Sequence, residues 1–459
     1  MCQSLSSAAT DEAATRCDTL GPIQMNLRRS FGVAFGVAVA IGSMIGAGIL
    51  RAPADVAAKL PLPALFLGAW VVGGAYALLG ANALAELGTM VPRSGGQYVF
   101  VRRALGPYAG FLVGWNDWIS TCGAVAAISL VLAEAVSTFA PALTSQTVLV
   151  AFVIVAIVTV ILWRGARESN VSQQITSVLK SLALLALVAA CLIARATGAA
   201  AMSPATTAPV AVPTGLALAA AFVTALQGVI YSYDGWTGIL YFSEEVQNTN
   251  QIPRSLFLGV LSAIAIYLLL NVAFLAVLSL PALAASPLAA ASAATAVFGP
   301  RGGTIVQLVV VLALPSAVIA NTLMSSRVAF ALGRDGAAPH FLAQVNKGGT
   351  PGAALITTSA VVGLFLLLGG AVEKVFAVCA FLFVASYTLS FTSVFVLRRR
   401  EPNADRPYRA KGHPWTTGLV LVGSLAFMGG VVAADPGTGL VALALVAVSY
   451  PVFKMTNRG

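Results

Sequence analysis

The sequence contains few charged residues. Lys, Arg, Asp and Glu make up only 9% of its 459 residues, whereas an ordinary soluble domain has about 25%. Hydrophobic residues make up 58%, and the mean hydropathy is +0.90. A soluble core has no room for so much apolar sequence. This composition excludes an ordinary soluble protein and indicates a chain embedded in a membrane.

Histidine and cysteine are also scarce, which argues against an enzyme or a metalloprotein. Both histidines, His340 and His413, fall in predicted loops, and no nucleophile–base pair or nucleotide-binding motif is present. Of the five cysteines, the last three lie inside apolar segments, and the spacing of the set suggests neither a disulfide framework nor a metal site: Cys2, Cys17, Cys122, Cys191 and Cys379. We therefore expect no catalytic residue, no metal and no cofactor.

The first 26 residues lack the features of a signal peptide. They have no basic start, no apolar middle and no small-residue cleavage site. Small polar and acidic residues dominate instead, so we expect residues 1–26 to form a disordered cytoplasmic tail.

Long apolar runs are what the sequence has in abundance. A helix of roughly 20 apolar residues can cross a hydrocarbon core of about 30 Å. Charged residues and Pro/Gly clusters bound twelve such runs, at roughly 31–58, 62–90, 108–139, 146–163, 172–196, 215–241, 255–280, 303–333, 352–370, 374–398, 415–433 and 438–455. The predicted fold class is an all-α polytopic membrane protein with about twelve transmembrane helices.

The net charge of +10 reflects topology rather than nucleic-acid binding. With the N-terminus in the cytoplasm, about 20 basic residues fall on the inner side of the predicted spans and about 5 on the outer side. This bias predicts that both termini are cytoplasmic and that the number of spans is even. We expect a multi-pass protein of the cell membrane, in contact with lipid.

Glycine and polar residues interrupt two spans at mid-depth. The first span contains GSMIGAGI at 42–49, and the sixth contains GVIYSYDGWTG at 228–238. Unwound backbone is tolerated in a bilayer only where protein or a water-filled cavity satisfies its polar groups. Matching breaks five spans apart indicate an inverted-repeat transporter with its substrate at the breaks. The glycines could instead serve only close helix packing, but the pairing of the breaks favours a binding site.

Short motifs occur in a fixed order along the chain. They are GSMIGAGI at 42–49, AELG at 85–88, PRSGGQY at 92–98, YDGW at 233–236, EEV at 244–246, GRDG at 333–336 and LRRREP at 397–402. This series resembles the amino acid–polyamine–organocation (APC) superfamily, and in particular bacterial relatives of the L-amino acid transporters (LAT family). One departure is the stretch 247–251, where the family usually has Lys-Asn-Pro.

The resemblance implies a fold of the LeuT type, with five plus five helices in inverted repeats and with helices 1 and 6 broken. The ten-helix core would span 27–400, with repeats at about 31–196 and 215–398. Residues 401–459 would add a cytoplasmic loop and helices 11 and 12. The family members with a disulfide-linked heavy subunit use a cysteine between helices 3 and 4. The sequence APALTSQ at 140–146 has none, so we expect no such partner.

Broken helices offer both kinds of group that an amino acid zwitterion needs. Free N–H groups at the start of a half-helix bind anions, and free carbonyls at the end of one bind cations. We therefore expect the backbone of Gly46, Ala47 and Gly48 to bind the substrate carboxylate. The remaining predicted substrate-binding residues, which include the carbonyls for the ammonium, are Ile41, Ser43, Tyr231, Ser232 and Asp234.

Two residues of the sixth span have further predicted roles. Tyr231 occupies the position at which the family places an aromatic gate over the substrate, although it could be an ordinary tyrosine facing lipid or the core. Asp234 is an ionisable group at mid-membrane depth, and such groups are functional by default. It could attract a cationic substrate or accept a proton, but the resemblance implies neither.

Lys180 is predicted to act as a built-in cation. A mostly apolar stretch, 181–194, lies between it and Arg195, so the ammonium cannot easily reach the outer surface. The resemblance implies that it replaces the cation of sodium-coupled proteins of this fold. The expected ligands are carbonyls near Met44 and Ile45 and the hydroxyl of Ser325 or Ser326. A lysine that reaches the cytoplasmic headgroups is the alternative.

Three further acidic residues lie in predicted spans. Glu86 belongs to the AELG motif and is expected to pair with a basic residue such as Arg93 or Arg102. Asp117 and Glu134 match no interpretable motif.

The sequence thus predicts a secondary active transporter rather than an enzyme. The expected substrate is a small or medium neutral L-amino acid, carried across the plasma membrane by sodium-independent exchange or proton-coupled alternating access. A cationic amino acid or polyamine carrier, which Asp234 and Glu134 would favour, is the first alternative. A non-transporting amino acid sensor is a weaker alternative, because no signalling domain is appended.

Overall fold

The structure is a computed structural model, and it describes residues 31–93, 95–164, 166–198, 212–286, 288–346, 349–368 and 372–456. Side chains of 166–174 and of residue 368 are not described. The tail predicted at residues 1–26 lies outside these ranges. Apart from one isolated bridge between Phe31 and Val246, the described residues form helices, turns and loops, with no strand.

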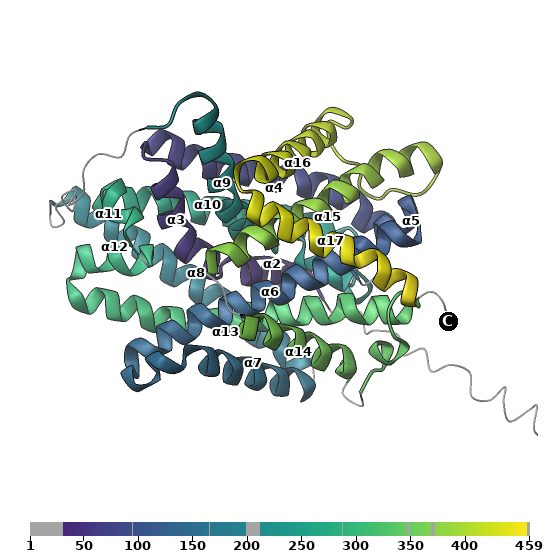
Figure 1. Ribbon diagram of the computed structural model, residues 1–459, viewed down its shortest axis with the longest axis horizontal. Helices are drawn as coiled ribbons and strands as arrows, with labels where there is room; N and C mark the ends of the chain where they lie inside the picture. Colours follow the sequence, from purple (N-terminus) through teal and green to yellow (C-terminus); the bar gives the residue numbers. More distant parts are fainter. Residues whose placement is uncertain are drawn as a thin grey trace, which may run out of the picture.

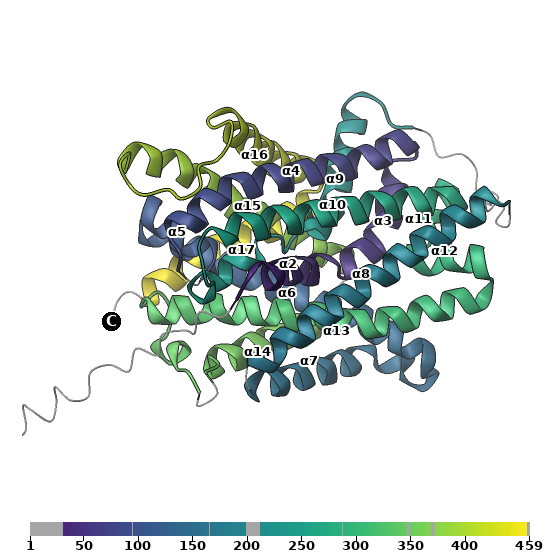
Figure 2. The same cartoon turned by 180° about the vertical axis from the view of Figure 1, so that it is seen from behind.

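Long helices run side by side through the molecule (Figures 1 and 2). Their bounds are α2 Val33–Met44, α3 Ala47–Lys59, α4 Pro63–Met90, α6 Pro107–Phe139, α7 Thr147–Arg164, α8 Ala166–Ala196, α9 Gly215–Tyr233, α10 Gln251–Val277, α13 Pro300–Arg334, α14 Gly352–Leu368, α15 Val372–Arg400, α16 Trp415–Ala434 and α17 Pro436–Thr456. Each overlaps an apolar run identified in the sequence. The sequence did not predict the short helices α5 Gln97–Leu105, α11 Leu280–Ala284 and α12 Ala289–Phe298, or the 3₁₀ turns η1 Pro141–Gln146, η2 Gly238–Glu245 and η3 His340–Ala343.

Membrane-length helices confirm the predicted polytopic all-α class. Among the described residues, ten helices are long and apolar enough to cross a membrane, and an eleventh span is formed if the bent pair α2–α3 is counted as one. The apolar helix α14 is shorter than this length. Counting it would give the expected twelve crossings. That count and the inverted repeat stay predictions.

Helix α6 lies at the centre of the bundle. In its most apolar stretch of 18 residues, 83% of the residues are buried, whereas the share in the corresponding stretch of α17 is 22%. It packs along α13 and α15, and α2 packs against α8, α10 and α13. Helix α17 ends at one end of the bundle, and α11 and α12 lie at the opposite end, called here the distal end (Figure 1). The broken helices α2–α3 and α9–η2 are therefore held inside a scaffold of unbroken ones.

Both predicted breaks are present. Helices α2 and α3 meet at an angle of 43° across Ile45 and Gly46. Helix α9 ends at Tyr233, and a turn at 234–237 leads into η2. Gly235 in this turn has φ +102°, and a Cβ there would lie 2.4 Å from Cβ of Ser43. Only glycine fits both the conformation and the close approach of the two breaks.

The C-terminal end of the bundle is held by a buried carboxylate. Glu86, which is 1% exposed, accepts hydrogen bonds from Arg398 Nε at 2.9 Å, from Arg398 Nη2 at 2.6 Å and from the Ala410 N–H at 2.7 Å. Arg406 Nε lies 3.2 Å from Glu86 Oε1. The expected pairing with Arg93 or Arg102 is wrong.

The residues expected to pair with Glu86 bind another carboxylate. Arg93 and Arg102 lie at 3.8 and 2.7 Å from the carboxylate oxygens of Asp335. The 401–414 loop folds back over α4, so residues distant in sequence are the partners of Glu86. Sequence proximity could not identify them.

Glu86→Ala should destabilise the protein. Removing one partner of a buried pair typically costs about 3–5 kcal/mol; because Arg398 is about a quarter exposed, we expect roughly the lower value. The melting temperature of Glu86→Ala in detergent should fall. That of Glu86→Gln should fall less, because glutamine keeps an acceptor oxygen. Unchanged melting of Glu86→Ala would refute this role.

Candidate functional site

The two helix breaks face each other inside the bundle. A Cβ on Gly48 would lie 2.7 Å from both Cα and Oγ of Ser232, so α3 and α9 are almost in backbone contact. On the α10 side, the Tyr267 hydroxyl lies 2.5 Å from the Met44 carbonyl oxygen and 2.8 Å from that of Ser232. One tyrosine therefore links carbonyl groups at the ends of α2 and α9.

A small cavity of about 10 Å³ lies between the breaks. It is lined by Ser43, Met44, Gly46, Ala47, Gly48, Ala124, Ile128, Tyr231, Asp234, Asn321 and Phe383. This volume is about what one water molecule requires. A larger ligand can enter only if the half-helices move away from the scaffold.

Most of the predicted substrate-binding residues line this cavity, and two do not. Ile41 lies farther back in α2, and its carbonyl accepts the N–H of Ile45 at 2.9 Å. The Ser232 hydroxyl donates to the Gly228 carbonyl at 2.7 Å, and the Ser232 carbonyl faces Tyr267. Both residues therefore make hydrogen bonds that hold the two helix breaks in place. In this conformation they lie behind the residues that line the cavity.

Four lining residues were not predicted from the sequence. Ala124 and Ile128 come from α6, Asn321 from α13 and Phe383 from α15. Asn321 is a polar residue within an apolar helix and is 5% exposed, which is the one signal that could have identified it. The other three are apolar residues of apolar helices and have no distinguishing pattern.

The start of α3 offers hydrogen-bond donors to the cavity. Gly46 is its N-cap, and its own N–H donates to the Met44 carbonyl at 2.8 Å, so it is not free for a carboxylate in this conformation. The free donors of the first turn begin with the N–H groups of Ala47 and Gly48. Helix N-termini bind anions because their first N–H groups lack partners within the helix and the helix dipole adds positive potential. The 13-residue helix α3 thus has the geometry of a carboxylate site.

An aromatic pair closes the cavity on its distal side. The rings of Tyr231 and Phe376 stack with centroids 3.9 Å apart and an interplanar angle of 17°. Tyr231 lines the cavity, but Phe376 does not. Within the described part of the chain, the buried Tyr231 hydroxyl has no hydrogen-bond partner. This arrangement matches what an aromatic gate requires, while the gating role itself stays a prediction.

Two buried carboxylates lie beside the break in α9–η2. Asp234 accepts a hydrogen bond from the hydroxyl of Tyr387 on α15. Asp117 on α6 lies 2.8 and 2.7 Å, through its two oxygens, from the hydroxyl of Tyr241 on η2. None of the ion pairs among described residues includes either carboxylate. Asp234 lines the cavity, but its side chain is already engaged by Tyr387.

Lys180 reaches the break in the first span from behind. Its ammonium donates to the carbonyl oxygens of Gly42 at 2.6 Å and Ile45 at 2.9 Å, and to the Ser316 hydroxyl at 3.2 Å. The side chain is 2% exposed, so it is buried in the protein and does not reach the headgroups. It lies outside the small cavity and contacts the opposite face of the α2–α3 break.

The expected hydroxyl ligands of Lys180 are not the observed ones. The Ser325 hydroxyl pairs with Cys122 Sγ at 3.4 Å, and the Ser326 hydroxyl donates to the Leu323 carbonyl at 2.9 Å. Ser316 precedes Ser325 by nine residues on α13, which is about 13 Å along a helix axis. The Met44 carbonyl faces Tyr267 instead.

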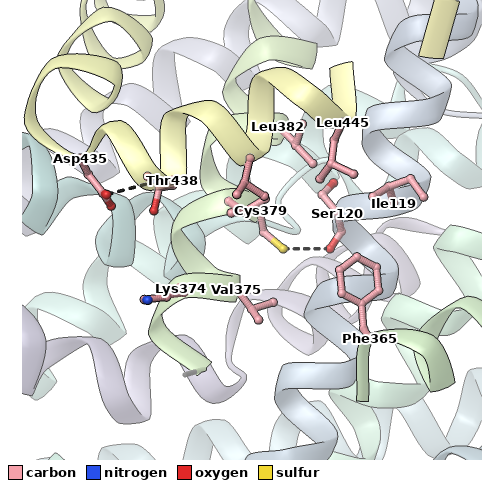
Figure 3. A pocket seen from close by; sticks show the side chains of 13 residues that line it. Ile119, Ser120, Phe365, Lys374, Val375, Cys379, Leu382, Asp435, Thr438 and Leu445 are labelled. Carbon is pink, nitrogen blue, oxygen red and sulfur yellow. Dashed lines mark hydrogen bonds between the residues drawn. The ribbon is translucent and has the colours of Figure 1, made fainter. Parts of the chain in front are cut away.

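A much larger cavity of about 440 Å³ lies between α6, α14, α15 and α17 (Figure 3). Its labelled side chains are mostly apolar, and the charged ones, Lys374 and Asp435, both lie on the left of the view. Cys379 Sγ donates to the Ser120 carbonyl at 3.2 Å in its wall. None of its lining residues belongs to either helix break, so the small cavity at the breaks is the better candidate site.

Comparison with known proteins agrees with this geometry. The sequence model of the family described as amino acid permease matches residues 34–449. The chain is 24% identical over 435 residues to the serine/threonine exchanger SteT of Bacillus subtilis (strain 168), covering 93% of this chain and 96% of that protein. It is 25% identical over 401 residues to the human b(0,+)-type amino acid transporter 1, with 84% and 80% covered.

A further relative is the mouse Asc-type amino acid transporter 1, 27% identical over 407 residues, with 83% of this chain and 73% of that protein covered. The family match includes both helix breaks and Lys180. This chain therefore belongs to the amino acid permease family, within the APC superfamily, and is a multi-pass membrane transport protein rather than an enzyme.

Proposed function

We propose that this protein is a sodium-independent secondary carrier of small or medium neutral amino acids. The observation that carries the proposal is the pair of facing helix breaks with Lys180 behind them. The free N–H groups of Ala47 and Gly48 at the start of α3 suit a carboxylate. The ammonium of Lys180 contacts two carbonyls at the end of α2, where a bound cation would otherwise be needed.

The lining of the small cavity supports a neutral substrate. Ala124, Ile128 and Phe383 offer apolar contacts to a side chain. The carboxylate of Asp234 already accepts a hydrogen bond from Tyr387, and Glu134 is paired with Arg51. The Tyr387 hydroxyl leaves Asp234 without a cationic partner among the described residues, so a carrier of cationic amino acids or polyamines stays the alternative that the transport assay tests.

Alternating access follows from the same geometry. The cavity is too small for an amino acid in this conformation, so binding and release require the half-helices to move relative to α6 and α13. Exchange requires that the carrier return only when loaded, whereas proton coupling requires a group that binds a proton. The named relatives include a serine/threonine exchanger, which supports exchange.

Proteoliposomes test the proposed function. Purified protein should take up a subset of labelled neutral amino acids, and preloading the liposomes with unlabelled substrate should accelerate uptake. Replacing sodium by choline should leave the rate unchanged, and an imposed proton gradient separates symport from exchange. Uptake restricted to lysine, arginine or polyamines would favour the cationic alternative, and absence of uptake of every amino acid would contradict transport.

Tyr231→Ala should weaken substrate binding about tenfold, while Tyr231→Phe should remain close to wild type. An aromatic pair contributes about 0.5–1.5 kcal/mol beyond its buried area, and alanine also removes the ring that covers the cavity. The hydroxyl has no partner among the described residues, so phenylalanine loses little. Half-saturation constants in proteoliposomes measure this. Equal effects of the two variants would mean that the hydroxyl, rather than the ring, is what matters.

We further propose that both termini face the cytoplasm of a cell membrane and that the distal end faces outward. The excess of basic residues on one side of the spans supports this orientation. Tags at either terminus should resist external protease in intact cells, whereas a tag at 203–209, a segment outside the described residues, should be cleaved. Termini on opposite sides would contradict an even number of spans.

A further inference from the structure

A second cavity lies on the distal side of the aromatic pair. Its volume is about 340 Å³, and α3, α9, α11 and the first turns of α15 form its walls. Phe376 lines this cavity, whereas its stacking partner Tyr231 lines the small cavity at the breaks. The two cavities therefore lie on either side of a single aromatic layer.

The lining of this distal cavity is charged but balanced. It includes two cations, Arg51 and Lys59, and two carboxylates, Asp55 and Glu373, so the formal net charge of its lining is zero. Lys59 and Asp55 are paired with each other at 2.7 Å. A balanced lining of this kind suits a zwitterion better than a cation or an anion.

Two buried donors in this cavity lack partners. Gln227 is 3% exposed, and its Nε2 makes no hydrogen bond to the described residues. Arg51 Nε is likewise buried with no partner there. Buried donors are nearly always satisfied in native proteins. Unsatisfied donors of the amide and guanidinium type indicate a missing acceptor, and a carboxylate is the acceptor that guanidinium prefers.

The ion pairs of Arg51 differ in strength. Nη2 is closely paired with Glu134 of α6. Nη1 lies 3.4 Å from Oε1 of Glu373, whose side chain is 52% exposed. The Arg51–Glu373 contact is therefore long and partly solvated, and such pairs contribute little. A ligand that carries both charges can separate them without leaving either one unpaired.

We propose that this distal cavity is a second binding site for the amino acid substrate, distinct from the site at the helix breaks. The zwitterion lies between Arg51 and Glu373. Its carboxylate accepts hydrogen bonds from Arg51 and Gln227, and its ammonium is bound by Glu373. The inference rests on the proposed function, because it takes the transported amino acid as the ligand.

Binding at this site is linked to the aromatic gate by position. Glu373 and Phe376 are three residues apart on α15 and so lie on one face of the helix. When the zwitterion holds Glu373, the first turn of α15 is no longer tied directly to Arg51 on α3. The substrate thus loosens the contact between the two helices next to the layer that it must pass.

The test compares the two sides of the membrane. Wild type and variants are measured in right-side-out vesicles, with the labelled amino acid that wild type transports best supplied either outside or inside. Glu373→Gln and Gln227→Leu should raise the external half-saturation constant about tenfold, the equivalent of one lost charged contact, and leave the internal constant unchanged. Asp55→Asn is the matched carboxylate comparison: Asp55 is already paired with Lys59, so its external constant should rise less than that of Glu373→Gln.

Several outcomes would overturn the distal site. One is an unchanged external constant in both variants, and another is an equal rise on both sides, which would indicate a structural effect. A rise in Asp55→Asn as large as that in Glu373→Gln would contradict the placement of the ammonium. A wild type that transports no amino acid would instead refute the proposed function, so the two failures are distinguishable.

Discussion

Lys180→Ala should reduce transport about 100-fold while leaving the protein folded. The ammonium donates to two carbonyls of the α2–α3 break and to Ser316 on α13. A hydrogen bond from a charged donor contributes about 1.5–3 kcal/mol, so losing the two contacts to the break should cost about two powers of ten in the population of the competent state. Initial rates in proteoliposomes, normalised to the amount of monodisperse protein, measure the effect.

Two controls separate the charge from the packing. Lys180→Met keeps most of the side-chain volume but loses the charged donor. Its transport rate should be as low as that of Lys180→Ala, because the carbonyls of α2 require the donor rather than the volume. Ser316→Ala removes only the longest of the three contacts, so its transport rate should fall by less than about tenfold. A fully active Lys180→Met, or a wild type that stops when sodium is withdrawn, would refute the assignment of Lys180 as the built-in cation.

Gly46→Val and Gly48→Ala should both abolish transport, but for different reasons. A Cβ on Gly46 meets its nearest neighbour, the Ser43 carbonyl oxygen, at 3.6 Å, which is an ordinary contact. The valine methyls would then fill the cavity and exclude the substrate. A Cβ on Gly48 would lie 2.7 Å from Cα of Ser232, and one of the two helix backbones must move. Overpacking of this kind typically costs about 1–3 kcal/mol.

The two glycine variants are therefore distinguished by stability. Gly46→Val should melt near the wild-type temperature in detergent and bind no labelled substrate. Gly48→Ala should melt lower and also fail to bind. Gly46→Ala, which adds a single carbon, serves as the matched control and should stay folded. Wild-type affinity in Gly46→Val would show that the break in the first span is not the substrate site.

The sequence by itself determined the class of this protein and the position of its breaks. Hydropathy identified each long helix because the length needed to cross a bilayer leaves a local signature. The breaks could be located because unwound backbone and polar residues at mid-depth are costly unless protein or a water-filled cavity satisfies their polar groups. Lys180 was identified for the same reason, since an ammonium within an apolar helix requires partners.

Only the tertiary structure decided which residues those groups contact. Ser316 rather than Ser325 faces Lys180, and Arg398 rather than Arg93 binds Glu86. The lining residues Ile128 and Phe383 belong to helices with no distinguishing pattern. The tilt and rotation of each helix about its axis set these contacts, and both depend on packing against neighbouring helices rather than on the hydropathy of the helix itself. The distal cavity with Arg51, Gln227 and Glu373 likewise exists only because three segments distant in the chain meet there.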